Sequence, residues 1–319
     1  MYTVAHDQWK GVMHAVVTPF DAEGAIDEAG FRHNIVTFLD EGVHGIVLAG
    51  DNGEAWALSD DEKVMLTRIT REIIDQSGSK AKLVVGTTQI PTAKTVEATK
   101  RVADAGADGA MVGPPTHLVV QTLTELVTRY DTVARQGGLP IIIYNNPRRN
   151  QINLTPDIID KLADIPGIVG LKDSHRDFSQ HTATLARAKD RINVMLGPCT
   201  QIFPAVLIGG AGYISTGPDI IGREGVQYYH DLVAGNVEKA VPVHYRLQRL
   251  YSTLNAVGTW PASMKVAFDM LGKRGGYPRA PILPIDEAGR EKIRAALIDT
   301  GLLNPDGTVA SEPALAGVR

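Results

Sequence analysis

The sequence has little of several features that would indicate a specialised class of protein. It has one cysteine, Cys199, in 319 residues, so it cannot form an intramolecular disulfide, and a reducing compartment is favoured. No segment approaches the roughly 20 consecutive apolar residues that span a bilayer. The N-terminus lacks the basic segment, apolar core and cleavage site of a secretory signal. We therefore expect a cytoplasmic protein with no membrane partner.

The charge balance argues against another class of partner. Asp and Glu number 36 against 32 Lys and Arg, which gives a formal net charge of −4. Neither a basic excess nor a run of basic residues indicates binding to nucleic acid. Hydrophobic residues make up 44% of the chain and charged residues 21%, which is typical of a globular protein with a core.

Eight short apolar segments recur along the chain, and helical patterns lie between them. The segments are continuously rich in Val, Ile and Leu, which is typical of parallel strands buried on both faces. Ser59 with Glu62, and Thr155 with Pro156, are start signals for two of the helices. The predicted strands are residues 13–20, 45–50, 82–88, 109–115, 140–147, 167–174, 192–198 and 211–216.

This alternation predicts an α/β protein, a closed (β/α)8 TIM barrel formed by residues 1–234. A doubly wound sheet is the alternative, but the G-x-G-x-x-G turn that usually follows its first strand is absent. Residues 235–301 have only helical patterns and predict a C-terminal helical region. Residues 302–319 lack hydrophobic periodicity and are expected to form a mobile tail.

A lysine, Lys172, ends the sixth predicted strand, and Tyr144 ends the fifth. Active sites of such barrels lie at the carboxyl ends of the strands, so we expect both side chains at one rim. Burial lowers the pKa of a lysine, and an uncharged amine attacks carbonyl carbons. A phenol beside it can exchange protons while a carbinolamine forms and loses water. Each residue alone has a simpler explanation, a solvated lysine or a core tyrosine, so the pair carries the prediction.

The segments YNNPRR, GIVGLKDS and GDNGE resemble those of the dihydrodipicolinate synthase and N-acetylneuraminate lyase family of class I aldolases, and softer matches extend over nearly the whole chain. The resemblance implies that Lys172 forms an imine with a 2-oxo acid, typically pyruvate, and that Tyr144 relays protons. It also implies a homotetramer or homodimer; no cofactor is expected. Because one imine supports aldol cleavage, condensation or dehydration, the lysine does not identify the reaction.

The chain departs from the family in the loop after the second strand. This loop reads Gly50-Asp51-Asn52-Gly53-Glu54, where most relatives have two hydroxyl residues between the glycines. Its backbone N–H groups could still hold a substrate carboxylate, but an ionised Asp51 only accepts hydrogen bonds and repels a carboxylate. Asp51 is therefore expected to point away, to contact a substrate hydroxyl or amine, to act as an acid or base, or simply to shape a turn. Glu54 is interpreted as structural, at the positive end of a helix dipole.

Two further positions bear on the reaction. Pro115 and Thr116, followed by His117, stand where the synthases have a tyrosine pair, so only Tyr144 remains of their proton relay. Arg149 falls on the arginine that contacts the carboxylate of the second substrate in the synthases, and a guanidinium suits that role. A solvated loop arginine is the alternative.

The remaining candidates have weaker support. Thr87, Ile214 and Ser215 either line the pocket or pack in the core, and the same holds for Trp260. Cys199 is expected to pack inertly. No metal is expected, because the nine histidines form neither H-E-x-x-H nor H-x-H; a metal-dependent aldolase is a weaker alternative. The candidate substrate-binding residues are Gly50, Asp51, Asn52, Thr87, Arg149, Ile214 and Ser215, beside the catalytic pair Lys172 and Tyr144.

The predicted function is that of a Schiff-base lyase. We expect an aldolase or dehydratase acting on pyruvate, a 2-keto-3-deoxy sugar acid or a related hydroxy-2-oxo acid. One alternative is 4-hydroxy-tetrahydrodipicolinate synthase, which condenses pyruvate with aspartate semialdehyde. The other is a non-catalytic protein that binds keto acids on the same scaffold.

Overall fold

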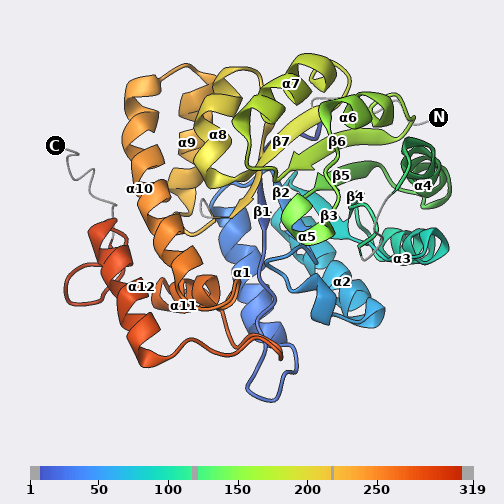
Figure 1. Cartoon of the computed structure of the whole chain (residues 1–319). Helices are drawn as coiled ribbons and strands as arrows, with labels where there is room; N and C mark the ends of the chain where they lie inside the picture. The colour runs from blue at the N-terminus through green and yellow to red at the C-terminus, as the bar shows by residue number, and fades with distance from the viewer. Residues whose placement is uncertain (1–7, 117–120, 217–218, 311–319) are drawn as a thin grey trace.

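The computed structural model describes residues 8–116, 121–216 and 219–310 (Figure 1). Eight parallel strands close into a barrel in sequence order, with the last strand beside the first. The predicted (β/α)8 barrel is confirmed, and the doubly wound alternative is wrong. The strands are Gly11–Ala15 (β1), Gly45–Leu48 (β2), Lys82–Gly86 (β3), Gly109–Val112 (β4), Ile141–Asn145 (β5), Ile168–Asp173 (β6), Asn193–Pro198 (β7) and Gly212–Thr216 (β8).

The first strand begins and ends earlier than its apolar run predicts. The Val16 N–H still donates to the Val47 carbonyl at 3.1 Å. After Val16 the chain leaves the barrel. Phe20 then forms isolated antiparallel bridges with Ile26 and Tyr277. The apolar run continues past the strand because Phe20 is buried under the C-terminal region, at 1% exposure.

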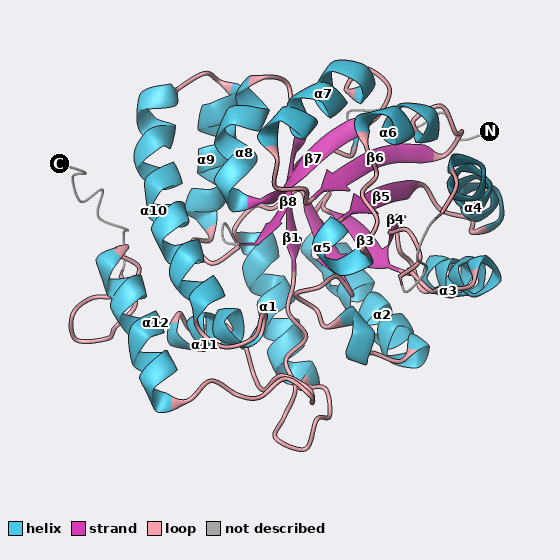
Figure 2. Ribbon diagram, viewed as in Figure 1, coloured by secondary structure: helices cyan, strands magenta, loops and turns pink. Residues whose placement is uncertain are grey.

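Helices surround the strands on the outside (Figure 2). The predicted capping box is present, since Ser59 and Glu62 hydrogen-bond reciprocally at the start of α2. Thr155 is the N-cap of α6, with Pro156 at the first helical position. The helices are Glu28–Asp40 (α1), Asp60–Ser77 (α2), Thr92–Asp104 (α3), Leu123–Gln136 (α4), Pro147–Asn150 (α5), Pro156–Leu162 (α6), Phe178–Ala188 (α7), Cys199–Leu207 (α8) and Arg223–Val233 (α9), with a short 3-10 turn at Ala55–Ala57.

The alternating direction of side chains along each strand divides the core in two. One set fills the barrel, and the other packs between the strands and the surrounding helices. Burial on both faces explains why the strands read as unbroken apolar runs. The residues inside the barrel include Met13, Val47, Val84, Met111, Ile142, Tyr144, Val169, Met195 and Ile214.

Three further helices, Val237–Ala256 (α10), Ala262–Met270 (α11) and Glu287–Asp299 (α12), cover one side of the barrel. In Figure 1 they lie beside α8, α9 and α1, and α10 contacts α8 and α9 directly. None of the described helices combines the length and apolar character needed to cross a membrane.

The segment after α12 packs on the protein for longer than expected. Leu302 and Leu303 are buried, and Leu303 pairs with Val309 in an antiparallel bridge. The expected tail therefore does not begin at residue 302. Residues 311–319 lie outside the part of the chain that the structure describes.

Candidate active site

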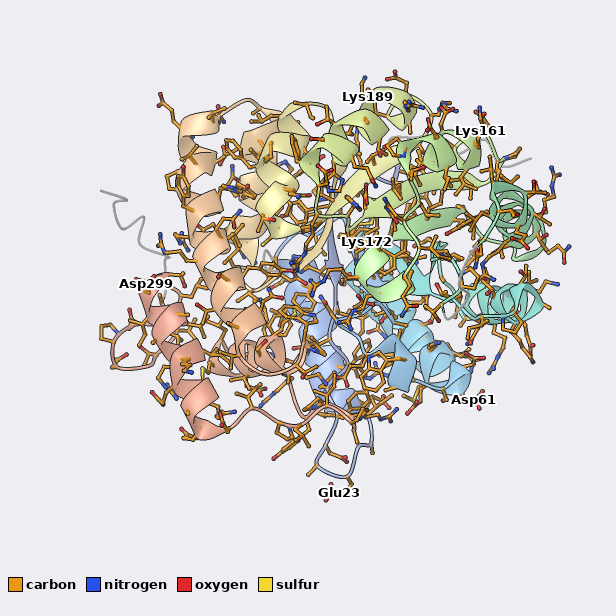
Figure 3. The ribbon with its side chains drawn as sticks, in the orientation of Figure 1. Glu23, Asp61, Lys161, Lys172, Lys189 and Asp299 are labelled. Atoms are coloured by element: carbon orange, nitrogen blue, oxygen red, sulfur yellow. The ribbon has the colours of Figure 1, made fainter. Side chains whose placement is uncertain are left out.

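Lys172 and Tyr144 lie side by side at the carboxyl ends of β6 and β5. They are direct partners in the strand register, and the Lys172 Nζ atom lies 4.6 Å from the centroid of the Tyr144 ring. Their exposures are only 6% and 8%. In Figure 3 Lys172 lies near the middle of the molecule, whereas Lys161 and Lys189 lie at its edge. The fold thus brings together the two residues predicted to carry the chemistry.

The Lys172 amine is buried without a close anionic partner. No other described residue accepts a hydrogen bond from Nζ or forms an ion pair with it. Burial lowers the pKa of this amine, while the more distant charges of Asp51 and Asp219 partly oppose the shift. A larger fraction of the amine is therefore uncharged at neutral pH than in a solvated lysine, as a nucleophile requires.

The Tyr144 hydroxyl is held by a small polar network. It donates to Asp51 Oδ2 at 2.9 Å and accepts from Asn146 Nδ2 at 2.8 Å. Burial and the neighbouring Asp51 charge raise its pKa well above the usual value. Tyr144 is therefore a protonated phenol whose hydrogen points at a carboxylate.

Three donors converge on the same oxygen of Asp51. Besides the phenol, Asn146 Nδ2 donates to Oδ2 at 3.2 Å, and Arg149 Nε lies 3.3 Å from it. Of the roles open to Asp51 from sequence, pointing away from the site is thus wrong. Arg149, on α5, is half-exposed, and this contact directs its Nε at a carboxylate of the protein itself.

Asn52 is buried, and both ends of its amide hydrogen-bond to the protein. Its Nδ2 donates to the Ala15 carbonyl at 2.7 Å, and its Oδ1 accepts from Trp260 Nε1 at 3.0 Å. Both residues line the cavity beside Lys172. Asn52 therefore fixes the wall of the site, and Trp260 brings the C-terminal region into it.

Glu54 is structural, but for a different reason from the one predicted. It pairs with Lys265 of α11 and accepts from the Arg279 backbone N–H at 2.9 Å. It has a φ of 54° and caps no helix N–H with its side chain. The Asp51 loop is thus anchored to the C-terminal region by a buried ion pair.

The predictions for Thr87, Ile214, Ser215 and Gly50 have different outcomes. The Thr87 hydroxyl is fully buried and hydrogen-bonds to Thr99 on α3 at 2.8 Å, so it faces a helix and not the cavity. Ile214 packs inside the barrel. The Ser215 side chain lies outside the described part of the structure. Gly50 lines the cavity.

The cavity has two lobes that share Asp51, Tyr144 and Arg149. The lysine lobe has a volume of about 380 Å³, and the second lobe about 510 Å³. The lysine lobe is also lined by Arg148, Lys172, Ser174, Arg176, Asn255 and Trp260. The second is also lined by Gly50, Trp56, Lys63, Thr88, Gln89 and Met111.

Asn146, Ser174 and Arg176 also line the lysine lobe, although none of them was predicted as a site residue. The signal for Asn146 is the second of two asparagines that follow Tyr144, where the strand ends and the backbone turns into α5. Asp173, beside the lysine, is structural: its carboxylate binds His181 Nδ1 at 2.9 Å and Asn145 Nδ2 at 3.0 Å.

Neither a metal site nor a reactive cysteine is evident among the described residues. Within the described residues, no three His, Cys, Asp or Glu side chains are grouped so that they could hold a metal ion. Cys199 is fully buried, and burial raises the pKa of its thiol. The inert packing predicted for this cysteine agrees with its surroundings.

Comparison with known proteins extends over nearly the whole chain. Residues 8–300 match the Dihydrodipicolinate synthetase family. An uncharacterized DapA-like lyase of Rhizobium meliloti is 32% identical, covering 91% of this chain and 95% of the relative. A 4-hydroxy-tetrahydrodipicolinate synthase of Methanoculleus marisnigri is 31% identical over 92% of this chain and all of that protein.

Solved structures agree with the sequence matches. Dihydrodipicolinate synthase from Thermotoga maritima superimposes with a TM-score of 0.87 at 29% identity, covering 93% of this chain and all of that one. A monomeric dihydrodipicolinate synthase variant superimposes with a TM-score of 0.88 at 28% identity, covering 95% of this chain and all of that one. Together with the lysine at the end of β6, these matches establish that the chain belongs to the dihydrodipicolinate synthetase family of lyases.

Proposed function

We propose that Lys172 forms an imine with the ketone of a 2-oxo acid, and that the protein uses this imine as a lyase, cleaving or dehydrating a hydroxy-2-oxo acid. The observation that carries the proposal is the buried Nζ atom in the lining of a cavity, 4.6 Å from the centroid of the Tyr144 ring and without an ion-pair partner among the described residues. A lysine in this setting is neutral often enough to attack a carbonyl.

Tyr144 is placed to move the protons of imine formation. As Nζ attacks C2, the carbonyl electron pair moves to oxygen; the phenol gives that oxygen a proton and receives one from nitrogen. A second proton, supplied from solvent through the same phenol, lets the hydroxyl leave as water. The nitrogen lone pair then completes the C=N bond, which leaves a protonated imine on Lys172.

The protonated imine serves as an electron sink for the next step. In an aldol cleavage the C3–C4 electron pair moves toward the imine and forms an enamine, while the C4 hydroxyl becomes a carbonyl and loses its proton. In a dehydration a C3 proton is lost first and the C4 hydroxyl then leaves. Both reactions need a proton acceptor near C3 and C4, beside Tyr144.

The lysine lobe suits an acidic substrate longer than pyruvate. Arg148 and Arg176 line it in addition to Arg149, whose guanidinium is engaged by Asp51. Guanidinium groups favour carboxylate ligands, and the volume of about 380 Å³ is typical of small-molecule sites. We therefore favour a 2-keto-3-deoxy sugar acid or a related hydroxy-2-oxo acid as substrate.

A second candidate is 4-hydroxy-tetrahydrodipicolinate synthase. Several relatives at 29–33% identity, matched over 97–100% of their length, carry that name. Against it, Asp51 stands where the resemblance to the family implies a hydroxyl, and Arg149 is engaged by that carboxylate. We rank the synthase second for these reasons.

Two assays on the purified protein separate the candidates. One uses a panel of 4-hydroxy-2-oxo acids and 2-keto-3-deoxy sugar acids. It measures release of pyruvate, for aldol cleavage, and loss of the C4 hydroxyl, for dehydration. The other measures condensation of pyruvate with aspartate semialdehyde. We expect turnover in the first assay; robust turnover confined to the second would establish the synthase. Imine formation without turnover in either would favour the non-catalytic binding protein.

We also propose that the protein is a homodimer or homotetramer in the cytoplasm. The proposal is supported by the family's typical oligomers and by the single cysteine, which suits a reducing compartment. One structural neighbour is a monomeric variant, so the mass in solution must be measured by light scattering.

A further inference from the structure

We propose that Asp51 is the terminal proton acceptor of the site: it takes the Tyr144 proton when the phenol removes one from the imine-bound substrate. This proposal rests on the proposed Lys172 imine. It assigns this role to a carboxylate in the loop after β2.

The geometry defines the direction of proton transfer. The Tyr144 hydrogen is directed at Asp51 Oδ2, 2.9 Å from the phenol oxygen. Asn146 Nδ2 donates to both oxygens, at 2.8 and 3.2 Å, so it fixes them relative to each other. The phenol oxygen borders the lysine lobe, which Tyr144 and Lys172 both line, and the Ser174 side chain hydrogen-bonds to it there. A substrate proton reaches this oxygen when the bound substrate takes the place of the Ser174 hydroxyl.

A carboxylate changes what this position can do. A hydroxyl that receives a proton must give up its own to a further acceptor, whereas an ionised carboxylate has no proton to give up and can accept one directly. Arg149 Nε lies 3.3 Å from the same oxygen and forms an ion pair with the carboxylate. The described residues thus provide a two-step path that ends on Asp51.

The transfer balances for a simple probe, pyruvate. In its imine, a C3–H bond breaks, its electron pair forms the C2=C3 bond, and the C=N electron pair returns to nitrogen. The C3 proton goes to the Tyr144 oxygen, and the Tyr144 proton goes to Asp51. The products are a neutral enamine, an intact phenol and a protonated carboxyl group. Reversal in D2O, after Asp51 exchanges its proton with solvent, places deuterium on C3.

The experiment follows this exchange by NMR and the imine by mass spectrometry after borohydride reduction. Wild-type protein should exchange the methyl protons of pyruvate for deuterium from D2O. It should also give a reduced adduct on Lys172. Asp51→Asn keeps the size of the side chain but removes the base. We expect its adduct at equilibrium to remain within about threefold of wild type, while the exchange rate falls by roughly 10²–10⁴-fold, the usual contribution of a positioned acid or base.

Further variants separate proton transfer from support of the loop. Asp51→Glu restores a carboxylate and should exchange at least tenfold faster than Asp51→Asn. Asp51→Ser lacks a carboxylate and should not show this increase. Arg149→Gln removes the ion pair but leaves the carboxylate, and should lose less than tenfold. Asp131→Asn, on the outer face of α4, controls for an amide substitution remote from the site.

The outcomes are distinguishable. If wild-type protein gives no adduct with pyruvate, the proposed function fails, and the role of Asp51 fails with it. If the adduct forms and Asp51→Asn exchanges within fivefold of wild type, Asp51 is not the acceptor. If Arg149→Gln loses as much exchange as Asp51→Asn, Asp51 serves only to hold the arginine, and the proposal is overturned. Should Asp51→Asn fail to fold, the comparison of Asp51→Ser with Asp51→Glu gives the same decision.

Discussion

The Lys265 Nζ atom lies 2.5 Å from Glu54 Oε1, and the two side chains are almost completely buried, at 1% and 0% exposure. Nζ also donates to the carbonyls of Thr18 and Tyr277, at 2.7 Å each. One ammonium group therefore joins three segments: the segment after β1, the Asp51 loop and the loop after α11. The position of Asp51 depends on the C-terminal region through this ion pair.

We expect removal of either charge of this pair to destabilise the protein strongly. Glu54→Gln leaves a buried ammonium uncompensated, and Lys265→Met leaves a buried carboxylate; breaking such a pair costs about 3–5 kcal/mol. Guanidinium unfolding followed by circular dichroism measures the loss. Asp61→Asn, which removes the surface partner of Arg101, should leave the midpoint unchanged. A similar midpoint for Glu54→Gln and wild type would contradict the anchoring role.

Asp219 predicts a pH-dependent gain in stability on substitution. Neither carboxylate oxygen has a hydrogen-bond partner in another described residue, and burial raises its pKa to about 8. The unfolded chain releases this proton near pH 4, whereas the folded protein keeps it until about pH 8. Between these values the unfolded state binds fewer protons, so this group lowers the free energy of unfolding as pH rises.

Asp219→Asn should therefore unfold at a higher temperature than wild type. The difference should grow from pH 5 to pH 8, by no more than about 1.4 kcal/mol per pH unit, and level off above pH 8. Thermal unfolding of both proteins across this range provides the measurement. A difference that stays constant with pH would show that the carboxyl group does not titrate in this window.

Trp260 predicts an effect on substrate affinity rather than on imine formation. Trp260→Phe keeps the aromatic wall but removes the donor to Asn52 Oδ1. An unsatisfied buried oxygen costs about 1–3 kcal/mol, so we expect the wall to shift and KM to rise with little change in the Lys172 adduct. Steady-state kinetics and borohydride trapping on the same preparation distinguish these effects. Loss of the adduct with KM unchanged would place Trp260 in the chemistry instead.

Tyr144→Phe removes the phenol while keeping the ring beside Lys172. We expect adduct formation to slow by roughly 10²–10⁴-fold, because the carbinolamine then lacks a positioned proton donor. Stopped-time borohydride trapping with pyruvate measures this rate. An unchanged rate would exclude Tyr144 from the mechanism.

Much of the fold and the centre of the site could be predicted because they depend on local patterns. Continuous Val, Ile and Leu runs indicate parallel strands, and the ends of consecutive strands must meet, which places Lys172 beside Tyr144. Thr87 illustrates the limit of this reasoning. It follows β3 directly, but its hydroxyl faces α3, while the next residue, Thr88, lines the cavity; a one-residue step reverses the direction of a side chain.

Long-range contacts could not be predicted in the same way. Asn52 meets Trp260 and Glu54 meets Lys265 across more than 200 residues of sequence. The hydrophobic periodicity of the sequence does not predict these contacts, because they depend on how α10 and α11 pack against the barrel. The same holds for Asp51: its residue type marked it as unusual, but only the positions of Tyr144, Asn146 and Arg149 show what it contacts.

The most direct test of the account is borohydride reduction in the presence of pyruvate, followed by peptide mass spectrometry. We predict one reduced adduct, on Lys172, that is absent from Lys172→Ala, although the chain has other buried lysines, Lys63, Lys265 and Lys273. An adduct on a different lysine, or none with pyruvate or any longer 2-oxo acid, would contradict the account.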